Sequence, residues 1–516
     1  MITSLLIAAA FAIQPAPVPA PNAGTPKPAE TVAPATAPAA APVDWKVAES
    51  ALLTRHIQLT RREDFIKAGE AYFSRDGRSI IFQAIPVPKA GEGPDQFYSM
   101  YVADVAFDGE AIKGLTNVKR VSPPGSANTC GWFHPTDNNR VLFGSTIVPP
   151  SAKGKPGFQV GTSRYIWQFP EEMEVVTVDL NSGGADAQQV KPLFSRPGYD
   201  AECSYSAEGR FVLYANVDPA KAKPDGHQDA DIYIFDTKTS VQHPIVVAPG
   251  YDGGPFFSPD GNWICYRSDR AGNDLLQVYV AKLKYQVDAD GTRIPVGIER
   301  EYQLTHNEHV NWGPFWHPSG GFLVYATSEV SHRNYEVFAI ETDLKKLEGL
   351  AGKDAVQAEV GGAPSIVVPD ARTRRVTFAD GADVLPVFSP DGKYMMWTSQ
   401  RGPKLDSEEK PSSQLWIAEW PDTAGEKKGS VFGIITPEKA MEIGLFEWNK
   451  QVKCKAIRST VQERIPSDMV SVLPNEAGWI LYPAPTNHGP GYYDVQVVWV
   501  YHDGTTSVGS QCLWLS

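Results

Sequence analysis

Acidic and amide side chains recur at one position of an internal repeat, and such groups either bind cations or cap backbone turns. When the repeats are aligned on the residue that opens a tight turn, the position six residues upstream is Asn128, Asp200, Asp252, Asn311 or Asp383 in five of six copies, and Ala68 in the other. Glu202 adds a further carboxylate two residues after Asp200. A ring of such oxygens would hold a metal or a basic group. The same residues also cap turns by bonding nearby backbone amides, and a repeat protein would reuse that cap. Both interpretations stay open.

Histidines are the second group of residues that could take part in chemistry. His134 and His317 take the serine position of the turn in two copies, and His309 lies in the histidine-rich stretch HNEHVNWGPFWH at 306–317. Imidazole suits zinc binding and acid–base work. However, FHP and WHP look like variants of FSP, in which the turn side chain bonds the backbone. A loop His-x-x-His also needs two further ligands. We expect structural roles, keep these three residues as weak metal candidates, and expect no cofactor.

Motifs for covalent or nucleotide chemistry are missing from the sequence. There is no Gly-x-Ser-x-Gly nucleophile elbow, and no α/β segment to hold one. No Walker or dinucleotide glycine pattern follows a strand and opens a helix. These observations disfavour a peptidase in which a propeller gates a hydrolase domain.

The elements that position the polar residues are β-strands. Six copies of an aromatic strand, a tight turn and a second strand occur: AYFSRDGRSIIF from Ala71, GWFHPTDNNRVLF from Gly131, CSYSAEGRFVLY from Cys203, PFFSPDGNWICY from Pro255, PFWHPSGGFLVY from Pro314 and PVFSPDGKYMMW from Pro386. A third and a fourth strand follow each copy, the first fourth strand being RVSPP and the last GIITP. Six units of four antiparallel strands predict an all-β, six-bladed propeller over residues 50–438. The polar ring would then face solvent around one mouth of the channel.

Closure of the ring needs one more strand, since an open propeller exposes strand edges. The segment RHIQLTR at 55–61 looks like another fourth strand. We expect Ile57–Thr60 to pair onto the last blade and so join the two ends of the repeat region.

The SPDG strand–turn–strand units resemble the WD40-like (PD40) repeats of the TolB-type propeller family. The resemblance covers roughly residues 50–438 and matches that family's six blades. The family's N-terminal α/β domain is missing, and a Pro/Ala segment stands in its place. The resemblance implies a periplasmic, non-catalytic propeller that binds a protein.

The N-terminal region is typical of an exported chain. Residues 1–13 contain a short apolar run and an Ala-Phe-Ala triplet, which predict a signal peptide, and residues 14–43 form a Pro/Ala-rich linker. The net charge of −13 disfavours nucleic acid and favours a basic partner. We therefore expect a periplasmic or secreted monomer without a transmembrane segment in the mature chain.

The five cysteines and the C-terminal tail complete the prediction. Residues 440–516 match no family we can name, and YYDVQVVWVYHDGTTSVGSQCLWLS predicts a hairpin in a small β-subdomain. We expect Cys454 and Cys512 to form a disulfide and Cys265 to be a buried thiol, while pairing of Cys130 with Cys203 stays open.

Two functions from different classes follow. The first is an exported, non-catalytic propeller that acts as a protein- or glycan-binding scaffold in the cell envelope. The alternative is a metal-assisted polysaccharide lyase or hydrolase with its site at the propeller channel. Bound metal in the purified protein separates them.

Overall fold

A computed structural model describes residues 44–151, 170–182, 190–221, 229–350, 356–369, 371–420, 470–475, 478–483, 491–501 and 506–515. The predicted signal peptide, the linker, Cys454 and the strand GIITP lie outside these residues. Within the described part of the chain, no helix is long and apolar enough to cross a membrane.

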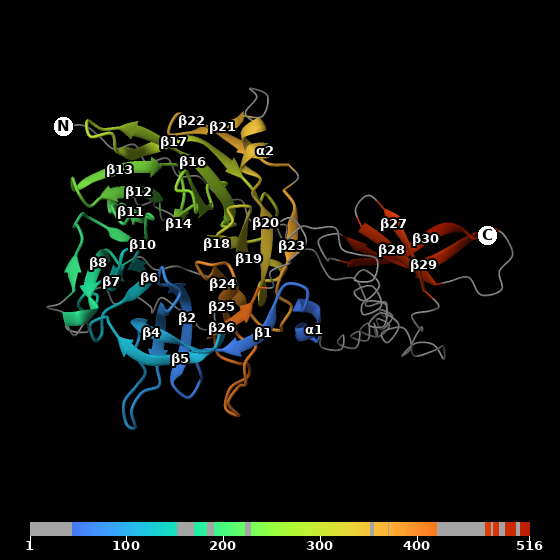
Figure 1. The fold of residues 1–516 in the computed structure, drawn as a ribbon, viewed down its shortest axis with the longest axis horizontal. Coiled ribbons are helices and arrows are strands. Elements are labelled where there is room, and N and C mark those ends of the chain that lie inside the picture. Colours follow the sequence, from blue (N-terminus) through green and yellow to red (C-terminus); the bar gives the residue numbers. More distant parts are fainter. Residues whose placement is uncertain are drawn as a thin grey trace, which may run out of the picture. The chain divides into compact units, whose positions relative to one another are not determined.

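Six blades form the propeller, each with four antiparallel strands that are mostly consecutive in the chain (Figure 1). Blade 1 is β2 (Phe65–Phe73), β3 (Ser79–Pro86), β4 (Ser99–Asp108) and β5 (Ala111–Arg120). Blade 2 is β6 (Asn128–His134), β7 (Asp137–Ser145), β8 (Glu174–Asp179) and β9 (Lys191–Pro192). Blade 3 is β10 (Tyr199–Tyr205), β11 (Phe211–Val217), β12 (Ala230–Asp236) and β13 (Val241–Val246).

The other three blades complete the ring. Blade 4 is β14 (Asp252–Phe257), β15 (Trp263–Ser268), β16 (Gln277–Val287) and β17 (Arg293–Gln303). Blade 5 is β18 (Asn311–Trp316), β19 (Phe322–Ser331), β20 (Asn334–Glu341) and β23 (Thr373–Arg375). Blade 6 is β24 (Asp383–Phe388), β25 (Tyr394–Ser399), β26 (Gln414–Glu419) and β1 (Thr54–Gln58). The first strands of successive blades contact one another, and β24 contacts β2, so the ring is closed.

The N-terminal strand closes the ring as predicted. Strand β1 pairs antiparallel with β26, with Ile57 opposite Ile417 and Gln58 opposite Trp416. Leu59 continues the pairing through a backbone bond to the carbonyl of Leu415. The last blade therefore takes its outer strand from the start of the repeat region, and α1 (Trp45–Glu49) precedes that strand.

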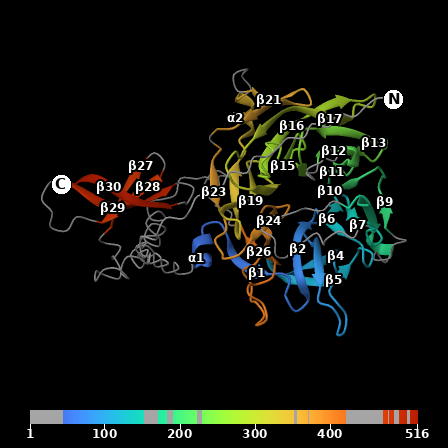
Figure 2. The ribbon, with the colours of Figure 1, turned by 180° about the vertical axis from the view of Figure 1, so that it is seen from behind.

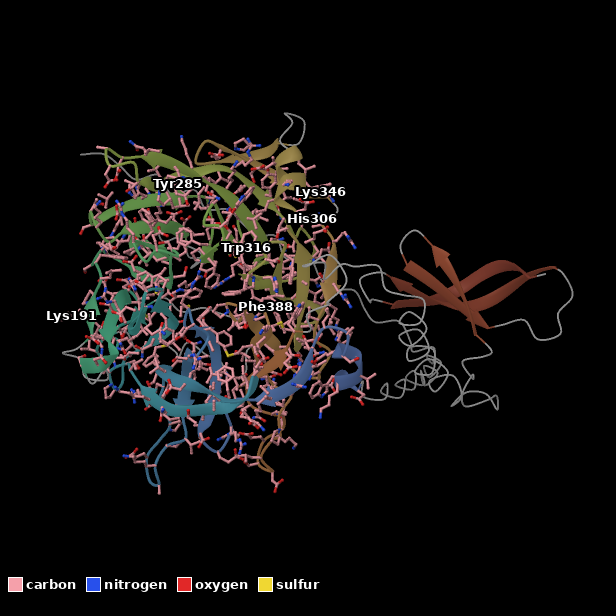
Figure 3. All side chains as sticks on the ribbon, in the orientation of Figure 1. Lys191, Tyr285, His306, Trp316, Lys346 and Phe388 are labelled. Carbon is pink, nitrogen blue, oxygen red and sulfur yellow. The ribbon has the colours of Figure 1, made fainter. Side chains whose placement is uncertain are left out.

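Middle strands are mostly apolar and buried because neighbouring blades cover both of their faces. In β11, FVLYANV, every residue is buried. This pattern is expected for a strand packed on both sides rather than for one with a solvent face. Side chains fill the space between the blades (Figure 3), where Trp316 and Phe388 are each 3% exposed.

The SPDG turns are held by their own side chains. The Ser74 hydroxyl accepts a hydrogen bond from the Ser79 amide and donates to Asp76, which in turn accepts from the Arg78 amide. Gly77 supplies the positive φ of 69° that the turn requires. Ser258 and Ser389 make the same bonds in blades 4 and 6.

Long connections gather at one end of the blades. The second strand of each blade runs to the third at the end where the first strand begins, and we call this end the loop face. There, residues 87–98, 146–173, 218–229, 269–276 and 400–413 connect strands. The opposite end, the turn face, carries the tight turns between first and second strands. Two longer connections lie on that side, residues 180–190 between β8 and β9 and residues 342–372 between β20 and β23. The second contains α2 (Leu344–Gly349) and the hairpin β21 (Val356–Val360) and β22 (Ala363–Val367).

The insertion in blade 5 extends its neighbour. Strand β22 pairs parallel with β17, so the sheet of blade 4 has six strands (Figure 2). Two single-turn 3₁₀ helices, η1 (Leu180–Ser182) and η2 (Pro219–Lys221), lie in other connections. The predicted first outer strand RVSPP was misplaced, since β5 already ends at Arg120.

The C-terminal region contains a separate four-stranded antiparallel sheet. Its strands are β27 (Val470–Asn475), β28 (Gly478–Pro483), β29 (Gly491–Tyr501) and β30 (Thr506–Leu515), paired in chain order. Strands β29 and β30 form the predicted hairpin.

Candidate functional site

The polar ring starts the innermost strands as predicted, but it does not face solvent. Asn128, Asp252, Asn311 and Asp383 are the first residues of their strands, and Asp200 is the second of its strand. Asp200 and Asp252 are 0% exposed and Asp383 is 1% exposed. Asn128 and Asn311 are buried as well. The expected solvent-facing charges at the channel mouth are therefore wrong, because each blade covers these groups.

The aspartates bond side chains of their own blades. Arg270 lies 2.8 Å from Asp252, and Arg401 lies 2.5 Å from Asp383. In blade 3 the partner is Asn216, whose amide donates to Asp200 at 2.9 Å. The proposed capping of nearby backbone amides is thus replaced by pairing with side chains in the second strand or just after it. The sequence signal we missed is Ser-x-Arg at 268–270 and 399–401, which begins at the last residue of that strand.

Burial shifts the ionisation of these carboxyls. It raises the pKa of Asp200 to about 8, even though Arg196 and Asn216 favour the charged form, and Glu174 adds to the rise. It raises the pKa of Asp252 to about 7 despite the ion pair with Arg270. Arg270 also pairs with the buried Glu301, so one guanidinium serves two carboxylates. Such strongly shifted groups mark sites of function or of structural pairing, and here the partners indicate pairing.

The amides of the ring connect neighbouring blades. Asn128 donates from its side chain to the carbonyl of Tyr98 in blade 1, at 2.8 Å. Asn311 donates to Gln277 in blade 4, at 3.0 Å. These bonds satisfy polar groups that would otherwise be buried without partners.

A second repeated position, four residues before the turn residue, lines the propeller axis. A β-bulge lies there in every blade. The residue at the bulge has φ between 43° and 61° in all six blades: Glu70, Cys130, Glu202, Gly254, Gly313 and Leu385. Residues with a side chain rarely adopt this left-handed backbone conformation, which costs about 1–3 kcal/mol for a residue other than glycine. Four of the six blades have such a residue at the bulge.

Three of these strained residues belong to a buried polar network, which we call the axial cluster: Glu70, Cys130, Glu202, Tyr251 and Arg267. The Cys130 thiol donates to Glu70 at 2.8 Å. Glu202 accepts from Tyr251 at 2.6 Å and pairs with Arg267 at 3.2 Å. Glu202 therefore belongs to this cluster and not to the polar ring, where it was predicted.

The axial cluster is poorly suited to nucleophilic chemistry. Burial raises the pKa of Glu70, and the negative charge of Glu202 raises it further. Burial and the charge of Glu70 raise the pKa of the Cys130 thiol well above its usual value. A cysteine reacts as its thiolate, so Cys130 is held in its unreactive form. The raised pKa of Glu70 favours its protonated form, and its side chain lines the cavity beside it.

Aromatic side chains fill the axis. Tyr72, Trp132, Phe256 and Phe315 occupy the same position of four blades, two residues before the turn residue, and their ring centroids lie 5.1 to 6.3 Å apart. The remaining cavity, beside Glu70, Glu202 and Arg267, has a volume of about 20 Å³. That is room for about one water molecule.

The histidines have structural surroundings. The Nδ1 atom of His317 accepts from the Ser319 amide at 3.1 Å, and that of His134 accepts from the Thr136 amide at 3.4 Å. Both thereby replace the turn serine as predicted. Burial lowers the pKa of His317 to about 4. His309 bonds through its backbone to Asn307 and Gln277. Among the described residues, no three His, Cys, Asp or Glu side chains lie together as a metal site would need.

Three cysteines are free thiols in the described blades. Cys265 is fully buried, as predicted. Cys130 and Cys203 are also buried and unpaired, although Cys203 lies 3.7 Å from the carbonyl of Cys130. The pairing of Cys454 with Cys512 remains a prediction, because Cys454 lies outside the described residues.

Comparisons with known proteins give partial similarities. No protein-family profile matches the chain. The uncharacterized peptidase YuxL of Bacillus subtilis is 24% identical over 208 residues, which are 38% of this chain and 28% of that protein. The chain thus matches less than a third of that relative's length.

Solved propellers are similar at low identity. The putative TolB from Agrobacterium tumefaciens has 14% identity and a TM-score of 0.36, and the match covers 69% of this chain and 90% of that one. Oligogalacturonate lyase from Vibrio parahaemolyticus has 12% identity and a TM-score of 0.38, covering 71% and 94%. In this chain itself, the blade number and strand order agree with the TolB-like propeller predicted from the repeats.

Proposed function

We propose that this chain is an exported, non-catalytic propeller that binds a protein or glycan of the cell envelope through its loop face. The observation that carries the proposal is the distribution of connections. Connections of eight residues or more join the second and third strands in five blades, all at the loop face. Loops placed by a rigid scaffold are where binding residues concentrate.

The interior supports the same proposal, because each aspartate of the ring already bonds a side chain of the protein. The aspartates of the ring pair with Arg270, Arg401 and Asn216. An arginine and an aspartate held together in a buried site offer little to a ligand, since separating them would leave a charge unpaired. Their role is to fix the blades beneath the loops.

A polysaccharide lyase or hydrolase is the second candidate, and Glu70 is the observation that favours it. Its carboxyl has a raised pKa, as a general acid would. A sugar would need to reach it through the axis, where the cavity has a volume of about 20 Å³ and four aromatic rings pack together. A cavity of this volume has no room for a sugar, which argues against the enzymatic alternative.

Loop replacement tests the proposal. A variant with residues 88–97 replaced by a short Gly-Ser turn should lose capture of its envelope ligand, while a matched variant with residues 288–291 shortened on the turn face should retain it. Both variants should still unfold cooperatively, although the first loses the packing of Phe97 on the core and should melt at a somewhat lower temperature. Retained capture by the first variant, or cleavage of a polysaccharide by the purified protein, would contradict the proposal.

A further inference from the structure

A groove on the loop face has the size and the lining of a ligand site. Three segments line it: residues 94–97 with Ser99, the pair Gly125 and Ser126, and Pro149. Its volume is about 310 Å³, at the lower end of the roughly 300–1,000 Å³ typical of small-molecule sites. We call it the blade-1 groove.

The blade-1 groove is preformed by rigid backbone. Gly125 has φ of 78°, and a Cβ added there would lie 3.2 Å from Pro149. The glycine thus allows residues 125 and 149 to approach. Pro94 and Pro149 fix φ at two positions of the lining, which lowers the entropy cost of binding.

The lining offers one aromatic face and several polar atoms. The Phe97 ring is half-buried and packs against the core that contains Ala127, Met173 and Tyr199, so its position is fixed. Gln96 is exposed beside it. Aromatic faces with adjacent amide and hydroxyl groups suit ligands that have both C–H and O–H surfaces.

The charges at the rim balance. The Asp95 carboxylate lies 3.8 Å from Arg120, and its side chain is 41% exposed. The Arg120 side chain is held in place because it donates hydrogen bonds to the carbonyls of Ser122 and Pro123. An anion would meet Asp95 and a cation would meet Arg120. An apolar ligand would cover these groups and remove their contact with water without bonding them, which costs free energy.

We infer that the blade-1 groove binds a neutral glycan unit of one or two sugars. Its C–H face would lie on Phe97, and its hydroxyls would bond Asp95 and Gln96. This inference rests on the proposed function, because it assigns the glycan alternative to one groove of the loop face.

Titration of the full chain with neutral oligosaccharides tests the inference. The probes are maltotriose, cellotriose and chitotriose, with the trimer of galacturonic acid as an acidic comparison, followed by calorimetry and by ligand-observed NMR. At least one neutral trimer should bind more tightly than the acidic trimer. Asp95→Asn and Gln96→Ala should each weaken that binding at least tenfold, while Glu308→Ala, an exposed control elsewhere on the loop face, should leave it unchanged.

Several results would overturn the inference. They are an absence of binding by every neutral trimer, tighter binding of the acidic trimer, and neutral binding that is insensitive to both groove variants. Capture of an envelope ligand that depends on residues 88–97 would still support the proposed function in each case, so the two failures are distinguishable. Because both groove substitutions are at partly or fully exposed positions, loss of folding should not obscure the result.

Discussion

Glu49 and Arg401 form a buried bidentate ion pair, with nitrogen–oxygen distances of 2.8 and 3.0 Å. The pair joins α1, which precedes the closing strand, to the last blade. Arg401 also bonds Asp383 of the polar ring, and Glu49 accepts from the amide of Phe378. A residue of the predicted ring therefore takes part in closing the propeller.

Removal of Glu49 should destabilise the whole ring. Glu49→Ala leaves Arg401 with one of its two carboxylates, and breaking a buried pair costs about 3–5 kcal/mol. Chemical denaturation monitored by tryptophan fluorescence measures the change. The control is Arg55→Ala, which breaks an ion pair with Glu419 at a side chain that is 70% exposed. That change should cost less than about 1 kcal/mol, and equal effects of the two variants would contradict the account.

Substitutions of Asp252 distinguish the two interpretations of the polar ring, which are buried pairing and exposure to solvent. Asp252→Ala should cost about 1–3 kcal/mol, because Arg270 loses an acceptor in a buried site. Asp252→Asn should cost less at neutral pH, since a pKa of about 7 already leaves much of the carboxyl neutral. Thermal melts compare both with Asp406→Ala, an exposed control that should change stability by less than about 0.5 kcal/mol. A solvent-facing ring would instead give Ala variants as stable as the wild type.

Stability should fall as pH rises from about 4 to about 8. The pKa of Asp200 is raised from 3.8 to about 8 in the folded protein, so the folded state holds a proton that the unfolded chain releases. The resulting stabilisation is complete below about pH 4 and is lost as pH passes about 8. Asp200→Asn should flatten part of this slope in denaturation experiments between pH 5 and pH 9. An unchanged slope would show that Asp200 is ionised in the fold.

Metal should be absent or far below one equivalent in the purified protein. His134→Ser should keep the turn, because serine makes the equivalent bonds in blades 1, 4 and 6. Elemental analysis of the wild type and of this variant checks the first expectation, and melting checks the second. Stoichiometric manganese or zinc that His134→Ser removes would restore the metal-assisted alternative.

The sequence predicts the repeated features well because they are local. The SPDG turns, the six blades, the closing strand at Ile57 and the burial of Cys265 follow from short patterns. The first outer strand was misplaced because β5 is an exposed strand with little apolar periodicity. Residues 344–375 were recognised as a loop insertion, but the strands β21 and β22 within them were not predicted, since the pairing of β22 with β17 joins residues of different blades.

The site was harder to predict because its partners are distant in the chain. The position of Asp383 was recognised, whereas its burial depends on Arg401 and on Glu49 from the far end of the repeat region. The axial cluster requires four blades to bring Glu70, Cys130, Glu202 and Arg267 together. Spacing within one repeat contains no information about such contacts.

Site-specific photo-crosslinking tests most directly whether the loop face is the binding face. A photoreactive residue at Gln96 should form a specific adduct with a component of a cell-envelope extract. The same residue at Glu208, exposed on the turn face, should form none above background. Adducts at Glu208 with none at Gln96 would contradict the account.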